Sequence, residues 1–299
     1  MRKFGEYLLA RTGRAAGVAF LCALLPLIGF PGGFLASIII GFVTLCRGPR
    51  SGLFVMAWVV LPALVLLYLH RFGLNDIILL RAVLVWLFAY TLRRLGSWTR
   101  VFEVGLVLGL MVVVAVHIAI PDLTTWWTTH LTKYLADINK ATSMKLTAAQ
   151  SAEFVKRVVP MATGIVAFIV LFGSWLVLLL ARWWQTAIYY PGRLGDEFIG
   201  VRNTVLAAMV LVLGAVGVYL NQAIAIDLFP VLLFPFMMGG LSFMHYLSAA
   251  AKGFIVLVVL MYLGIFLLPF IVVVLLALIG FLDTCFNFRK FIKIKGDIS

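Results

Sequence analysis

Segment 181–202 is a polar stretch between two apolar runs, and it holds the densest group of side chains able to form ion pairs and aromatic contacts. Tryptophans, tyrosines, arginines and two acidic residues lie there beside a Pro-Gly turn. Tryptophans next to a snorkelling arginine are typical of an anchor at the lipid headgroups, but anchoring does not explain the turn or the Glu-Phe pair that follows it. The candidate residues are Arg182, Trp183, Trp184, Gln185, Pro191, Gly192, Glu197, Phe198 and Arg202.

Segment 181–202 has two interpretations. It is a structural clasp if Glu197 or Asp196 pairs with Arg182 or Arg202 and so fixes the turn. It is a docking site if the same side chains face a partner protein. Ion pairs are often merely structural, so the clasp is the simpler interpretation, and the partner site stays open.

A second polar motif, containing Asp283, Phe288 and Arg289, closes the last apolar run. We expect Asp283 to pair with Arg202 and Arg289 to pair with Glu197. These pairings would tie the end of the chain to segment 181–202.

Four ionisable residues, Arg81, Glu103, His117 and His245, lie in or near apolar runs. A charge inside a membrane is costly unless it is paired or hydrated, so each is a functional candidate by default. Arg81 and Glu103 are close enough to helix ends to reach the interface. The histidines are expected as neutral, hydrogen-bonded packing residues.

Enzyme signatures are absent from the sequence, which has no His-Glu-x-x-His, no Gly-x-Ser-x-Gly, no phosphate loop and no carboxylate cluster. The cysteines Cys22, Cys46 and Cys285 have neither zinc nor redox spacing, so free thiols are expected. The sequence therefore predicts no catalytic residue, no metal site, no cofactor and no enzymatic activity.

Composition indicates a membrane protein. Hydrophobic residues make up 64% of the 299 residues and charged residues 12%, a balance that would give a soluble domain a largely apolar surface. The net charge of +13 sits in short Lys/Arg clusters between apolar runs, as the positive-inside rule requires, so it does not indicate nucleic acid. The basic N-terminus lacks a convincing signal-peptide cleavage site, and a retained first helix is expected.

The apolar runs predict an all-α, polytopic helix bundle of about eight spans. Residues 1–14 read as a basic amphipathic helix on the cytoplasmic face. Segment 15–45 is interrupted at 30–33, so its halves are too short to cross comfortably and form a tight hairpin. Segment 121–160 carries an amphipathic helix on the outer surface. The remaining spans are expected over 53–69, 77–92, 101–120, a stretch ending near 180, 203–220, 228–248 and 254–281.

Two details complete this topology. A capping box at Thr147 and Gln150 opens a helix that runs through Pro160 into the span ending near residue 180. Both termini are predicted to be cytoplasmic. To keep them so, either 254–281 is a hairpin broken near Pro269 or 223–248 is re-entrant.

The motifs Ala181-Arg-Trp-Trp-Gln185, Pro191-Gly192 and Leu282-Asp-Thr-Cys-Phe-Asn-Phe-Arg289 resemble signatures of the YybS-like family of bacterial membrane proteins, which carry a domain of unknown function. The resemblance extends over essentially the whole chain. Arg193 stands where a second glycine is usual in that family, and Asn287 where an aspartate is usual. The resemblance implies a location in the bacterial inner membrane.

The YybS-like family is distantly similar to the S components of energy-coupling-factor vitamin transporters. That similarity implies a six-helix core over 15–180, followed by the cytoplasmic element 181–202 and C-terminal helices over 203–299. In S components an alanine face docks on the coupling subunit. Ala15, Ala19 and Ala23 share one face at i, i+4 spacing, which equally suits packing within the chain.

These observations lead to one hypothesis and one alternative. The chain is a small-molecule binding or transport protein, with its cavity on the outer side beneath 121–160 and a separate subunit supplying energy. Alternatively it is a membrane scaffold or assembly factor that recruits a protein partner through 181–202 and the C-terminal motif.

Overall fold

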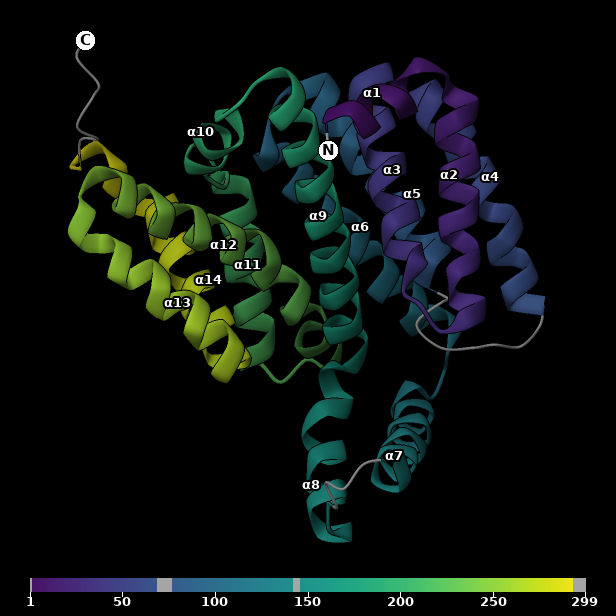
Figure 1. Cartoon of the computed structure of the whole chain (residues 1–299). Coiled ribbons are helices and arrows are strands. Elements are labelled where there is room, and N and C mark those ends of the chain that lie inside the picture. Colours follow the sequence, from purple (N-terminus) through teal and green to yellow (C-terminus); the bar gives the residue numbers. More distant parts are fainter. Residues whose placement is uncertain (1, 69–76, 142–145, 293–299) are drawn as a thin grey trace.

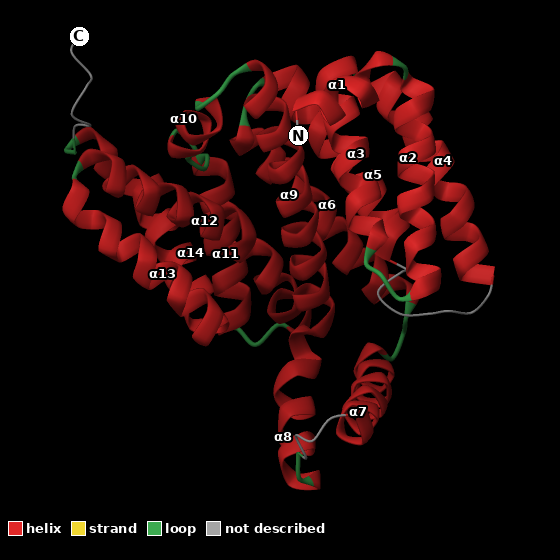
Figure 2. Ribbon diagram, in the orientation of Figure 1, coloured by secondary structure: helices red, strands yellow, loops and turns green. Residues whose placement is uncertain are grey.

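The computed structural model describes residues 2–68, 77–141 and 146–292. Helices fill these ranges apart from short connections, and no strand occurs in them (Figure 2). The predicted all-α class is thus confirmed. Glycine and proline interrupt the apolar runs at most of the helix boundaries, as their backbone preferences require.

Within the described residues, four helical stretches are long and apolar enough to cross a membrane, or five if the bent pair of α1 (Arg2–Ala10) and Thr12–Ile28 counts as one span. The prediction of about eight spans is not confirmed, because four further helices of the described residues have apolar stretches of only 10–17 residues. The four long stretches are α6 (Trp98–Ala119), α8 with α9 (Ala148–Tyr189), α12 (Ala223–Ala250) and α14 (Pro269–Phe286).

The N-terminal helices form one group (Figure 1). As predicted, the 15–45 run is a hairpin of α2 (Thr12–Leu24) and α3 (Gly32–Arg47). Gly32 makes the tight return possible, because a Cβ there would lie 2.0 Å from a carbonyl oxygen of α2. The group is completed by α4 (Pro49–Tyr68) and α5 (Ile77–Leu95), both of which pack on α3.

The alanine face of α2 is occupied within this chain. Ala15, Ala19 and Ala23 have no exposed surface, and α2 packs against α3 and α4. In this conformation the face is therefore intramolecular packing, and it is not free to receive a coupling subunit.

The middle of the chain holds a long helical rod. The predicted capping box is present, with Thr147 and Gln150 bonded to each other's backbone at the start of α8 (Ala148–Val158). Through a short 3-10 turn at Pro160, α8 continues into α9 (Ala162–Tyr189). The predicted boundary at 181 therefore falls inside α9.

The amphipathic helix α7 (Leu123–Ala141) pairs with α8 instead of lying alone on a surface. A small core of Leu135, Val155 and Val159 joins the two helices. Figure 1 shows this α7–α8 hairpin projecting away from the main bundle, at the end opposite α1 and α10.

The C-terminal group contains α10 (Arg193–Ile199), α11 (Val205–Tyr219), α12, α13 (Ile255–Leu267) and α14. The chain doubles back between α13 and α14 at Leu268, directly before Pro269 (Figure 1). The hairpin alternative is therefore the one that the structure contains, while 223–250 is one continuous helix.

Glycines let α12 and α14 approach at backbone distance. A Cβ on Gly240 would lie 1.9 Å from the carbonyl oxygen of Leu276, and a Cβ on Gly280 would lie 2.1 Å from that of Phe236. Small residues on facing helices give this kind of close contact in membrane proteins. The pair forms the most extensive helix contact in the described chain.

Candidate functional site

The clasp at the end of α9 is built around Arg182 and Glu197. The guanidinium donates two hydrogen bonds to the carboxylate, one of them 3.0 Å long from Nε to Oε2. Trp98 Nε1 donates to the same carboxylate at 3.3 Å, and Arg193 Nε lies 3.1 Å from it. One of the pairings expected from the sequence, Arg182 with Glu197, is thus present.

The environment of Glu197 favours its charged form. Burial by itself raises the pKa of this carboxyl, but the hydrogen bond and charge of Arg182 lower it, as do the Trp98 hydrogen bond and the charge of Arg193. The net effect is a pKa below the usual value. Because both side chains of the Arg182–Glu197 pair are about 15% exposed, the bond is shielded from water.

Gln185 extends the clasp to the N-terminal group. Its side-chain nitrogen donates to the carbonyl oxygen of Leu45 at 3.1 Å, and Arg93 donates to the same oxygen. This carbonyl lies in the last turn of α3, where no intrahelical donor is available. Two other helices, α5 and α9, therefore complete the end of α3.

The two tryptophans of the motif have different surroundings. Trp184 is 8% exposed and stacks between Phe42 and Phe4, at ring distances of 4.5 and 5.8 Å. Trp183 is 44% exposed and lines an apolar groove of about 380 Å³ together with Phe4. Trp184 is therefore a packing residue, and Trp183 is the one that faces outward.

The turn that follows α9 is formed by Pro191 and Gly192, and both residues are exposed. Gly192 has a φ of 89°, a left-handed conformation that glycine adopts without strain. Phe198, at the end of α10, lies between the rings of Trp175 and His245, at 6.0 and 5.6 Å. In the Glu-Phe sequence, Glu197 thus forms the ion pair, and Phe198 packs against the core.

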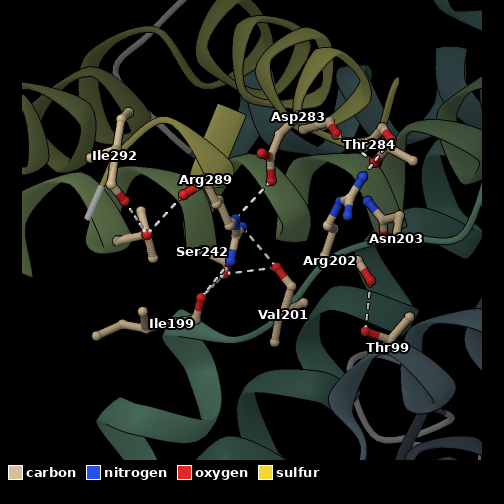
Figure 3. Close-up of polar contacts among 12 residues, drawn as sticks. Thr99, Ile199, Val201, Arg202, Asn203, Ser242, Asp283, Thr284, Arg289 and Ile292 are labelled. Atoms are coloured by element: carbon tan, nitrogen blue, oxygen red, sulfur yellow. Dashed lines mark hydrogen bonds and ion pairs between the residues drawn. The ribbon is translucent and has the colours of Figure 1, made fainter. Parts of the chain in front are cut away.

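A second cluster surrounds Arg289 (Figure 3). Its Nε donates to Asp283 Oδ2 at 2.8 Å, and its two Nη atoms donate to the carbonyl oxygens of Ile199 and Val201 at 2.5 and 2.8 Å. Ser242 Oγ also donates to the carbonyl oxygen of Val201, at 3.0 Å. The planar guanidinium therefore binds three acceptors from α14 and the end of α10 at once.

The short extended segment 201–204 is held by three helices. Arg202 donates to the carbonyl oxygen of Thr284 at 3.0 Å, and Thr99 donates to that of Arg202 at 2.8 Å (Figure 3). Asn203 donates to the carbonyl oxygen of Pro235 at 3.0 Å, and Thr204 donates to Glu103 at 2.8 Å. Non-helical backbone that is buried requires such partners, because its polar groups have no bonds within a helix.

The pairings expected between the two motifs are wrong. Arg289 pairs with Asp283 and not with Glu197, while Arg202 binds a backbone oxygen and not Asp283. The physical reason is that Arg182 and Arg193 already neutralise Glu197. The motifs are nevertheless joined, through backbone carbonyl groups of 199–201. Phe288 stacks obliquely on Phe243, 6.2 Å away.

A polar cluster at the other end of α9 contains a residue that we did not predict to be a site residue. Asp227 is 3% exposed, and its Oδ1 accepts from the backbone N–H of Gly164 at 2.8 Å. His117 Nε2 lies 3.7 Å from Oδ2. Trp127 donates to Thr163 at 2.9 Å beside them. The available signal was that Asp227 is the single acidic residue between positions 198 and 282.

A hollow of about 230 Å³ lies beneath α7, between α5, α6 and α9. Its walls are almost wholly hydrocarbon, and Thr163, whose hydroxyl is already bonded to Trp127, is the main polar side chain. The lining includes Leu80, Leu84, Leu108, Val112, Trp126 and Trp127.

The other ionisable residues have different surroundings. Glu103 pairs with Arg100 at 2.8 Å, and His245 bonds Leu241 and Tyr262, so both are satisfied locally. Arg81 is 8% exposed, so its side chain is buried within the bundle and does not extend to the surface as expected. Within the described ranges, no three His, Cys, Asp or Glu side chains form a group that could hold a metal.

Comparison with known proteins adds no relative to these findings. No family model, no curated protein and no solved structure matches this chain.

Proposed function

We propose that this chain is an integral membrane protein that binds a small molecule and takes part in its transport. The observation that supports the proposal is the hollow beneath α7, on the side opposite the clasp. A small-molecule site in a helix bundle is expected between helices, with apolar walls and few polar groups. The resemblance to S components is a separate reason for the same proposal.

The hollow suits the apolar part of a ligand. Its volume of about 230 Å³ is below the roughly 300–1,000 Å³ of most ligand pockets, and its lining offers little to a charged group. We therefore expect an aliphatic or aromatic moiety there, under the cover of Trp126 and Trp127. Because the chain carries no ATP-binding motif, energy for transport would come from another subunit.

Two matched valine variants of α6 test this function. Val112 lines the hollow and is 45% exposed, whereas Val107 is 55% exposed and does not line it. Val112→Trp should fill the hollow, and Val107→Trp should add the same bulk outside it. The measurement is native mass spectrometry of each protein, extracted gently from its host membrane.

The expected result is a stoichiometric small-molecule adduct on the wild type and on Val107→Trp, and its loss from Val112→Trp. An adduct that persists in Val112→Trp would remove the hollow as the site. A wild type that carries only bulk lipid would contradict the proposal.

The scaffold function is a second candidate, supported by the outward-facing Trp183 and its groove. Tyr189 and Tyr190 are also about half exposed at this end of the molecule. The same mass spectra test it, because a protein partner bound through this face should be lost from Trp183→Gln. A partner that Trp183→Gln retains would argue against the face, and spectra without any partner would argue against a scaffold.

A further inference from the structure

Arg81 on α5 is buried without a counter-charge. Its residue exposure is 8%, and its Nε is fully enclosed and has no hydrogen-bond acceptor. The guanidinium makes neither an ion pair nor a hydrogen bond with any residue in the described ranges. Arg182 and Arg289 contrast with it, since each of them binds a carboxylate.

The surroundings of Arg81 include an aromatic ring on α3 and a glycine on α9. Its central carbon lies 3.9 Å from the ring centroid of Phe34 on α3, so the aromatic ring covers one face. On α9, Gly173 presents only backbone, and a Cβ added there would be 3.9 Å from Nη2. The N–H groups point along the plane of the guanidinium, where a carboxylate or phosphate binds in bidentate fashion.

The electrostatics require a partner for this cation. A guanidinium removed from water is costly unless an anion or a set of acceptors replaces the water. The side chain does not escape this cost by snorkelling, because it is buried. An aromatic face compensates only a part of it.

We propose that Arg81 is the binding group of an anion site between α3, α5 and α9, and that its ligand carries a carboxylate or a phosphate. Arg81 does not line the hollow beneath α7, so this site stands independently of the proposed function. The anionic group can belong to a free solute or to a lipid headgroup, because both offer the same paired oxygen atoms.

The experiment uses the full chain in nanodiscs of zwitterionic phosphatidylcholine and follows its thermal unfolding. One arm titrates inorganic phosphate, and the other replaces a fraction of the lipid by phosphatidylglycerol. The variants are Arg81→Gln and, as the matched control, Arg93→Gln, which removes the same charge from the same helix. Arg93 already donates to Leu45, so its loss should lower stability without changing the response to anions.

The expected result is that an anion raises the Tm of the wild type and of Arg93→Gln, and that Arg81→Gln loses the effect or needs at least tenfold more anion. A response to phosphate indicates a free solute, and a response to phosphatidylglycerol alone indicates a headgroup. Without anion, Arg81→Gln should be at least as stable as the wild type, because the neutral amide needs no counter-charge. If Arg81 had only a structural role, Arg81→Gln would instead be less stable than the wild type without anion.

Two results would overturn the proposal. The first is an equal response of the wild type and Arg81→Gln, or no response of the wild type in either arm. The second concerns Asp76, which precedes Arg81 in the sequence and lies outside the described residues. The overturning result is an anion-induced rise in the Tm of Asp76→Asn that the wild type lacks, because it would mean that Asp76 already neutralises Arg81.

Discussion

Asp227 of α12 completes the first turn of α9, because its Oδ1 accepts a hydrogen bond from the backbone N–H of Gly164 at 2.8 Å. The first N–H groups of a helix have no partner within it, and a local N-cap side chain usually supplies one. The N-cap position of α9 is occupied by Met161, which makes no such bond. A residue from a different helix takes over this role, and so α12 fixes where α9 begins.

Asp227→Ala should lower the free energy of unfolding by roughly 1–3 kcal/mol, because it leaves a buried N–H of α9 without an acceptor. Thermal unfolding in a fixed detergent measures the change. Asp137→Ala is the control, since the side chain of Asp137 is 61% exposed and its only ion pair spans 3.9 Å. Equal losses of stability in Asp227→Ala and Asp137→Ala would contradict the capping of α9 by Asp227.

Gly240→Ala and Gly280→Ala should each destabilise the C-terminal group by about 1–3 kcal/mol or more, because the added Cβ meets backbone atoms that cannot move aside. Gly17→Ala is the matched control. Gly17 also lies within an apolar helix, α2, but a Cβ there would meet nothing within 4 Å. Unfolding in SDS, followed by circular dichroism, compares the three variants. Equal stability of the three variants would show that the close contact of α12 and α14 does not contribute to the stability of the C-terminal group.

The clasp should lose stability in acid through Glu197. Its pKa is lowered in the folded chain from the usual value of 4.5, so its contribution is fully present above that pH. The contribution is lost as the pH falls through the lower, folded-state pKa. The difference in Tm between the wild type and Glu197→Gln should therefore be largest near neutral pH and shrink below about pH 4.5.

The exposed pair of Glu153 and Arg157 supplies the control for this pH series. Exposed pairs contribute about 0–1 kcal/mol, so Glu153→Gln should change the Tm little at any pH. A constant difference between the wild type and Glu197→Gln across pH 7 to 3 would refute the role given to Glu197.

Arg289→Lys should destabilise the chain although it keeps the charge, by roughly 1–3 kcal/mol. An ammonium group cannot reach Asp283 and the carbonyl oxygens of Ile199 and Val201 together, as the planar guanidinium does. Arg2→Lys, at an exposed ion pair with Glu6, should have no measurable effect. Wild-type stability in Arg289→Lys would show that charge alone matters at this position.

Local patterns in the sequence were sufficient to predict several elements of this fold. The capping box at Thr147 and the hairpin of 15–45 each depend on a few neighbouring residues. The break before Pro269 was one of two alternatives that the sequence left open. The pairing of Arg182 with Glu197 was one of four combinations that the sequence left open between two acidic residues and two arginines.

The long-range partners could not be predicted in the same way. Which acceptor Arg289 chooses depends on where α10 ends relative to α14, and no local pattern encodes that distance. The cap supplied by Asp227 depends likewise on the approach of α12 to Pro160 and α9. The predicted number of spans counted apolar runs between basic clusters without regard to helical length. It is not confirmed, because several of these helices are only 10–17 residues long in the described chain.

The continuous run of α8 and α9 has a geometric consequence. Its 42 residues are about 60 Å long at roughly 1.5 Å per residue, which is twice the apolar thickness of a bilayer, about 30 Å. If this run crosses a bilayer once, about half of its length lies outside the hydrocarbon core. Because Arg182 lies near the other end of the same run, helical backbone joins the clasp to the α7–α8 hairpin, with one 3-10 turn at Val159–Met161 between them.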